Sequence, residues 1–221
     1  MVSKTYRNKT CGYCGRDTGP SGEGEHVLPK CLYPDFTGPT IQHVKIPACP
    51  DCNNSWENDE AHFKTMLVLC GPDPTPARKQ LWERSVRSFE RPLHGEKEVR
   101  SITAQFVASP ILNELGSPYQ RIFPHKDPRV VRVLKKIVRG LEHFRTGDVI
   151  PEDRVEMHPS TFPLPAAYQD DLTEVFVVPS VFSAHAFFFS GTDASDMHSL
   201  WVLEFFESAR FYAMIASVGR T

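Results

Sequence analysis

The chain has 221 residues, of which 40% are hydrophobic and 11% aromatic, enough apolar material for one medium core or two small ones. This composition excludes a disordered chain, and no apolar run approaches the roughly 18 residues that a membrane span needs. The formal net charge of −2 is unevenly distributed. Residues 1–75 carry 7 basic and 9 acidic side chains, residues 76–145 carry 15 and 7, and residues 146–221 carry 3 and 11. We therefore expect the middle segment to meet a polyanion, through contacts that weaken steeply with salt.

The first seventy residues contain all six cysteines and, up to Pro50, frequent proline and glycine. The N-terminal residues lack the apolar segment of a secretory signal, so we expect a cytoplasmic protein with mostly reduced cysteines. Proline and glycine favour loops and short strands, whereas apolar residues at helical spacing predict helices. In chain order, the pattern predicts strands around 26–28 and 41–46, a helix over 53–69, a breaker run at 71–76, a helix over 77–90 and a strand over 99–108.

The second half begins with a helix that we expect over 128–145, opened by Pro128. Apolar residues define one face of this helix, and basic residues lie at steps of three and four on another. The basic residues are Arg129, Arg132, Lys136 and Arg139, which we expect to contact nucleic acid together with Lys30. The β-rich end, 170–218, contains aromatic and β-branched runs that predict strands over 174–178, 184–189, 200–206 and 210–216.

The most specific pattern is C-x2-C-x34-C-x2-C, formed by Cys11, Cys14, Cys49 and Cys52. Two thiolates two residues apart can bind one tetrahedral ion, and a second pair completes its coordination. We expect a structural Zn²⁺ in this closed four-thiolate site, which leaves no position for a substrate. Cys31 and Cys70 are expected to be small buried side chains.

Candidate chemistry lies between and just after the two cysteine pairs. Glu25 directly precedes His26, and Asn53 directly follows Cys52. Carboxylate and amide oxygens suit Mg²⁺ or a similar divalent cation, and an imidazole can take a proton from water near pH 7. Glu25 and Asn53 are therefore candidate ligands of a catalytic cation, and His26 is a candidate general base.

The string C-x-x-C…E-H-x-x-P-K…P-A-C-x-x-C-N-N…D-E resembles the HNH nuclease family in its zinc-stapled form. The asparagine after the last cysteine also resembles phage resolvases of the endonuclease VII type. The resemblance covers about residues 8–65 and implies a treble-clef, ββα-metal finger. It implies that Glu25 and Asn53 hold the catalytic cation and that His26 activates water. The family's middle asparagine is absent near Val44, where His43 is an alternative. Asn58 and His62 are alternatives for the metal position on the helix.

These observations predict an α+β protein with three parts: a finger over 1–72, a linker and helix over 73–98, and a C-terminal α+β domain over 99–221 with an antiparallel sheet. The expected activity is metal-dependent hydrolysis of phosphodiester bonds in nucleic acid, with DNA as the expected partner, no membrane, and a homodimer left open. Two alternatives remain open: a non-catalytic zinc module that binds nucleic acid or protein, and an acidic β region that controls the finger.

Overall fold

The computed structural model describes residues 6–35, 43–69, 75–90, 94–104, 107–112, 118–121, 126–159, 164, 166–189 and 197–217. The chain is a mixed α+β protein, as expected. Its helices are α1 Pro50–Asn54, α2 Glu57–Leu69, α3 Pro76–Phe89, α4 His94–Thr103, α5 Pro128–Thr146 and α6 Ala166–Gln169, with 3-10 turns η1 Lys30–Leu32 and η3 Glu152–Arg154. Its strands are β1 Glu23–His26, β2 Lys45–Ala48, β3 Val107–Leu112, β4 Pro118–Arg121, β5 Val155–Pro159, β6 Thr173–Val178, β7 Phe182–Phe188, β8 Met197–Phe205 and β9 Ala209–Ala216. None of the helices described is long and apolar enough to cross a membrane.

The described strands form three antiparallel sheets. β1 pairs with β2, β3 pairs with β4, and a five-stranded sheet has the order β5-β9-β8-β7-β6. The four strands predicted for the acidic end are confirmed as β6 to β9. Their aromatic and β-branched residues favour extended structure. β5 was not predicted; its sequence VEMHP alternates only weakly, and it pairs along β9 at the edge of the sheet.

α5 is the central helix of the molecule. The Asp127 side chain accepts a hydrogen bond of 2.8 Å from the Arg129 backbone N–H, and Pro128 occupies the first turn, where no donor is needed. Gly147 ends the helix at φ +81°, a left-handed conformation that glycine adopts without strain. The expected helix is therefore confirmed, with ends set by its own caps.

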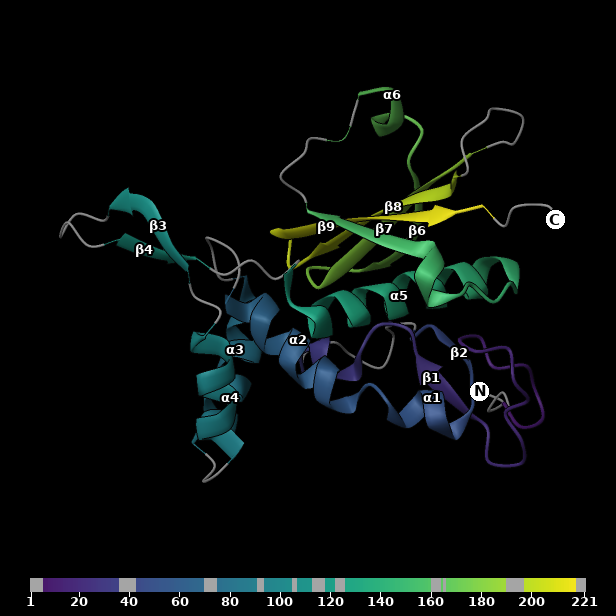
Figure 1. Ribbon diagram of the computed structural model, residues 1–221, viewed down its shortest axis with the longest axis horizontal. Coiled ribbons are helices and arrows are strands. Elements are labelled where there is room, and N and C mark those ends of the chain that lie inside the picture. The colour runs from purple at the N-terminus through teal and green to yellow at the C-terminus, as the bar shows by residue number, and fades with distance from the viewer. Residues whose placement is uncertain are drawn as a thin grey trace.

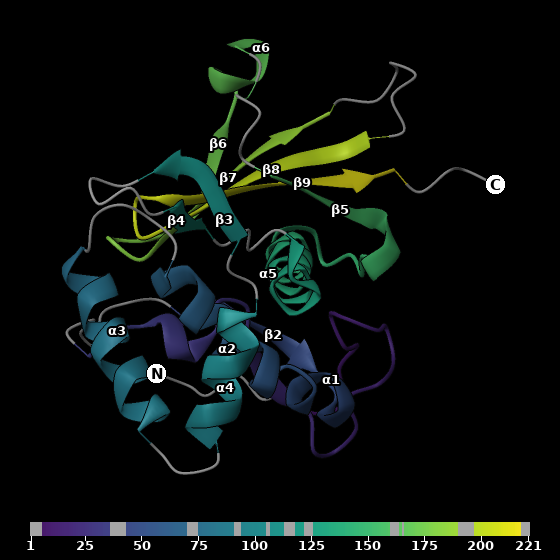
Figure 2. The same cartoon turned by 60° about the vertical axis from the view of Figure 1, so that its left-hand side comes forward.

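α5 continues through Gly140 without interruption. This glycine gives room for the end of the β1–β2 hairpin, because a Cβ there would lie 2.9 Å from both γ carbons of Val27. α5 lies between the five-stranded sheet and the layer formed by β1, β2, α1 and α2 (Figures 1 and 2). Val130, Leu134 and Leu141 are fully buried in this position.

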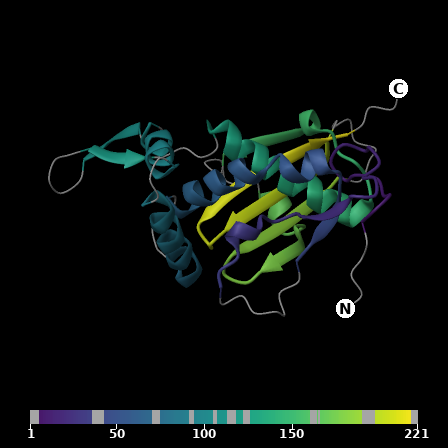
Figure 3. The same ribbon diagram turned by 90° about the horizontal axis from the view of Figure 1, so that it is seen from below.

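The core is continuous through these layers. The Phe63 ring of α2 packs edge-on against Phe205 of β8, with 5.3 Å between ring centroids. One cluster of buried apolar side chains runs from Cys11 near the N-terminus to Ile215 in the last strand. α3, α4 and the β3–β4 pair lie to one side of these layers (Figures 1 and 3). The parts predicted as finger and C-terminal domain therefore share a core.

Two predicted elements differ from the structure. The helix expected over 53–69 is two helices. Pro50 starts α1 directly after Cys49, and the helix is interrupted at Ser55 and Trp56 before α2 begins. The strand expected over 99–108 is wrong at its start, where α4 runs to Thr103. Val99 and Ile102 are β-branched, but their spacing of three suits one helix face, and Arg100 pairs with Glu96 one turn away at 2.7 Å.

Candidate metal centre and adjoining cavity

The four predicted cysteines gather at one end of the β1–β2 hairpin. The sulfurs of Cys11, Cys14, Cys49 and Cys52 all lie within 4.8 Å of one another. The Cys14 and Cys49 sulfurs are 3.7 Å apart, close to the roughly 3.8 Å that two ligands 2.3 Å from one tetrahedral zinc would show. The donor set and its spacing fit a structural Zn²⁺. Such an ion would tie the loop before β1 to the start of α1.

The backbone around these cysteines explains how they converge. Gly15 has φ +74°, and its N–H donates to the Cys11 carbonyl at 2.9 Å, closing a tight turn between the first two thiols. Gly12 donates to the Pro47 carbonyl at 2.9 Å and so fixes this turn against β2. The glycines are thus required for the turn and for its close approach to the hairpin.

The thiols differ in their electrostatic environment. Burial raises the pKa of Cys14, but hydrogen bonds from Arg16 outweigh burial and lower it to about 6. Burial and the neighbouring thiols raise the pKa of Cys52, and burial raises that of Cys11. Four thiolates at this spacing need a cation between them, and Zn²⁺ supplies that charge.

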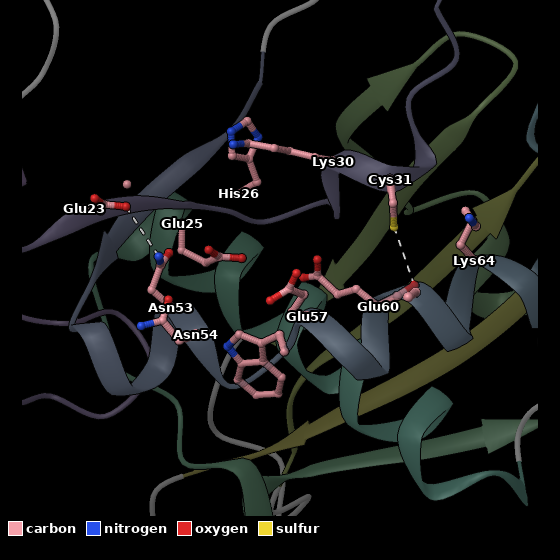
Figure 4. A pocket seen from close by; sticks show the side chains of 13 residues that line it. Glu23, Glu25, His26, Lys30, Cys31, Asn53, Asn54, Glu57, Glu60 and Lys64 are labelled. Carbon is pink, nitrogen blue, oxygen red and sulfur yellow. Dashed lines mark hydrogen bonds between the residues drawn. The ribbon is translucent and has the colours of Figure 1, made fainter. Parts of the chain in front are cut away.

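A cavity of about 520 Å³ adjoins the cysteine cluster. It lies between β1, η1 and the helices α1 and α2, and Figure 4 shows its side chains. Acidic, basic and amide groups line it: Glu23, Glu25, His26, Lys30, Asn53, Asn54, Glu57, Glu60 and Lys64. Glu25, His26 and Asn53, the residues predicted to act together, therefore border one cavity.

Glu25 is bound inside the cavity by a residue from outside the finger. The Lys136 side chain of α5 is fully buried, and its ammonium group donates to the carboxylates of both Glu25 and Glu60. Burial raises the pKa of Glu60, and the Lys136 charge opposes this effect. Lys136 therefore reduces the repulsion between two carboxylates that lie close together at this depth.

His26 leaves β1 on the opposite face from Glu25, as neighbouring residues of a strand do (Figure 4). Its side chain is 8% exposed, and neither ring nitrogen has a hydrogen-bond partner among the described residues. The His43 ring lies edge-on against it, with centroids 5.2 Å apart. Burial, together with the charges of Lys45 and Lys30, lowers the pKa of His26 to about 3. The imidazole is therefore neutral at physiological pH.

Of the three residues proposed for the helix side, only Asn53 reaches the cavity. Its amide nitrogen donates to Glu23 at 3.5 Å, so its amide oxygen is the atom that could hold a cation. Asn58 is exposed and does not line the cavity. His62 is buried, with its Nε2 2.6 Å from the carboxylate of Asp127, the residue that caps α5. His62 thus contributes to the packing of α2 on α5.

The basic residues of α5 were expected to face a polyanion, but the structure turns them toward the protein. Arg129 donates to Ser101 Oγ at 2.9 Å, Arg132 pairs with Asp59, Lys136 binds Glu25 and Glu60, and Arg139 donates to the Ile150 carbonyl at 2.7 Å. Lys136 and Arg139 are buried, which does not fit the expectation that they contact nucleic acid. Because α5 has protein on both sides, this stripe of basic residues meets partners within the protein. Lys30, by contrast, is exposed at the edge of the cavity.

Two residues of this region were not predicted as part of the site. Glu60 shares Lys136 with Glu25, and Lys45 lies directly across the hairpin from His26. The step of seven from Asn53 puts Glu60 on the same helical face and allows it to join a metal site, but its place in the acidic first turn of α2 favours a partner of the helix dipole. Lys45 had no signal beyond its place two residues after His43. Cys70 lies outside the described residues, and Cys31 is a half-buried thiol that donates to the Glu60 carbonyl at 3.5 Å.

Comparisons of the chain with protein-family models, with curated proteins and with solved structures each found no match.

Proposed function

We propose that this protein is an HNH-type, metal-dependent endonuclease that hydrolyses phosphodiester bonds in nucleic acid, with DNA as its substrate. One observation carries the proposal. An antiparallel hairpin followed by a helix, joined at the cysteine cluster, brings Glu25, His26 and Asn53 to one cavity. This is the order of elements that a zinc-stapled ββα-metal finger has.

The residues fit a hard divalent cation. Glu23, Glu25 and Asn53 offer oxygen donors from β1 and α1, and a hydrogen bond of 3.5 Å already joins Asn53 to Glu23 (Figure 4). When bound, such a cation would stabilise the negative charge that develops on the scissile phosphate. Lys136 holds one oxygen of Glu25 and so leaves the other for the cavity.

His26 is the group that takes the proton of the attacking water in this proposal. Its ring nitrogens are buried and have no described partner, so their hydrogen-bonding capacity is unfilled, and a water admitted to the end of β1 would find an acceptor there. Lys30 is exposed beside it and can pair with a phosphate oxygen. The attacking water and the phosphate would meet at the end of β1, where His26 is the last residue.

The test is nicking of supercoiled plasmid by zinc-loaded protein with Mg²⁺, Mn²⁺ or Ni²⁺. We expect His26→Ala to lower the rate by about 100-fold or more, the usual contribution of a general base. His185→Ala is the control, because His185 also lies on a strand, where it is half-buried, but belongs to the five-stranded sheet. Zinc content and melting temperature should stay the same in both variants.

A second candidate is a zinc module that binds nucleic acid without cleaving it. The ion pairs of Glu25 and Glu60 with Lys136 favour it, because a cationic group already meets these carboxylates. Among the described residues, only the four cysteines form a group of potential ligands within 4.8 Å of one another. If the wild-type protein binds DNA but does not nick it with any of the three cations, the nuclease proposal falls and this candidate stands.

A further inference from the structure

The outer face of the β1–β2 hairpin carries a group of basic side chains. Side chains alternate along a strand, so Glu25 and its cross-strand partner Ile46 point inward, whereas His26 and its partner Lys45 point outward. Ile46 is buried at 1% exposure, and Lys45 is exposed. The hairpin therefore separates an acidic inner face from a basic outer face.

Four side chains from three elements meet on the outer face. Lys45 lies opposite His26 in register, and the His43 ring is 5.2 Å from the His26 ring. Lys30 comes from η1, and its side chain extends toward His26 (Figure 4). We call these four residues, His26, Lys30, His43 and Lys45, the hairpin cluster. Tyr6 bounds it on one side, because its ring fills the space above Gly24, where a Cβ would lie 2.3 Å from a ring carbon.

The charges of the hairpin cluster are not held in ion pairs within the part of the chain that the structure describes. None of its four side chains forms an ion pair with a described carboxylate. His26 is more than nine-tenths buried with both ring nitrogens unpartnered, which is costly unless a ligand supplies the missing hydrogen bond.

We propose that the hairpin cluster is the phosphate-binding site of this protein and holds a backbone phosphate of nucleic acid beside the end of β1. The two lysines supply charge, and the imidazole of His26 supplies an N–H donor. The site includes Lys30, which the sequence predicts as a nucleic-acid contact, but it excludes the four residues of α5 that were predicted with it. The proposal rests on the proposed function for the identity of the polyanion, but it concerns binding and needs no cleavage.

The test measures the affinity of zinc-loaded protein for a fluorescent 20-base-pair DNA duplex by anisotropy, without a divalent cation other than zinc, over a range of salt concentrations. Lys30→Ala and Lys45→Ala should each weaken binding several-fold and lower the salt slope by about 0.9, the value for one lost phosphate contact on duplex DNA. Lys45→Arg should restore binding. Lys79→Ala, which removes an exposed lysine of α3, should change neither quantity.

A second measurement separates the sources of phosphate. Inorganic phosphate is titrated into the protein while the His26 imidazole is followed by NMR. We expect millimolar phosphate to shift this resonance in the wild type and not in Lys45→Ala, with affinity far below that for the duplex. Equal affinity for phosphate and duplex overturns nucleic acid as the ligand, and an unchanged affinity and salt slope in Lys30→Ala and Lys45→Ala overturns the site.

These outcomes differ from failure of the proposed function. A protein that binds DNA through the hairpin cluster and never nicks it retains this inference and loses the nuclease. A protein that nicks DNA equally well, at equal substrate concentration, without Lys30 and Lys45 retains the nuclease and loses this inference.

Discussion

The basic residues of α5 and those of the β1–β2 hairpin lie in opposite electrostatic environments. Lys136 of α5 is fully buried between two carboxylates, and Arg132 pairs with Asp59. Lys30 and Lys45 of the hairpin region are exposed and form no ion pair with a described residue. Both groups lie near the same cavity. The difference shows that position in the layers, and not charge per segment, decides which cations a polyanion can reach.

The charged side chains of α5 bind partners within the protein. A helix between two layers has little solvent-facing surface, so its polar side chains must meet partners within the protein. Arg132 lies over the Trp56 ring at 4.4 Å, and Lys136 joins Glu25 of β1 to Glu60 of α2. The net charge of the middle segment is therefore partly balanced by acids of the first seventy residues.

Removal of zinc should have the largest effect, because it frees the cysteine cluster that supports both the ion pairs of Lys136 and the hairpin cluster. The four cysteines join the turn at Cys11 to the start of α1, and β2 ends one residue before Cys49. Structural zinc couples on the order of 10 kcal/mol of metal-binding free energy to folding in small fingers. We expect one zinc per chain by elemental analysis, and loss of both the cooperative thermal transition and DNA binding after chelation.

Cys31→Ser is the matched control for this prediction, because Cys31 lies near the cavity but outside the four-cysteine cluster. It should retain full zinc content, whereas Cys49→Ser should lose it. A chelated protein with an unchanged melting temperature would contradict a structural zinc.

Lys136→Met should have the next largest effect, on stability. It leaves the carboxylates of Glu25 and Glu60 close together without their ammonium partner, and breaking a buried ion pair costs about 3–5 kcal/mol. For a chain of this size the melting temperature should fall by on the order of 10 °C. Lys135→Met, at the neighbouring position, should change the free energy of unfolding by less than about 0.5 kcal/mol.

A second variant separates charge from packing. Adding Glu25→Gln and Glu60→Gln to Lys136→Met removes all three charges together, and we expect this triple variant to recover most of the lost stability. If Lys136→Met melts at the wild-type temperature, the ion pairs are not what holds α5 to the finger.

The patterns that were predictable from sequence are those set by local spacing. The cysteine pairs, the start of α5 at Pro128 and the four strands of the acidic end follow from spacing, caps and β-propensity, and the structure contains them. The neighbours of each charge were not predictable in the same way. Arg129 to Arg139 form a regular stripe whether the helix faces solvent or a second layer, and only the packing of the hairpin on α5 decides between the two.

The candidate site shows the same limit at closer range. Sequence placed Glu25 beside His26 and Asn53 after Cys52, and all three border the cavity. It could not show that the strand sends Glu25 and His26 to opposite faces, since that depends on which residues β1 includes. Nor could it bring Lys136 to Glu25, because the two are 111 residues apart in the chain.

Arg132→Ala should have the smallest effect on stability. It tests directly whether the basic residues of α5 contact nucleic acid. Its guanidinium group is partly exposed, pairs with Asp59 and stacks on Trp56, so its loss should cost about 1 kcal/mol of stability. The affinity of Arg132→Ala for the DNA duplex should stay within twofold of wild type, in the assay where the affinity of Lys45→Ala falls several-fold. Arg132→Lys keeps the charge but loses the planar stacking, so it should fall between Arg132→Ala and wild type in stability. If Arg132→Ala instead weakens DNA binding as much as Lys45→Ala does, nucleic acid reaches α5 as well. The two groups of basic residues would then form one surface.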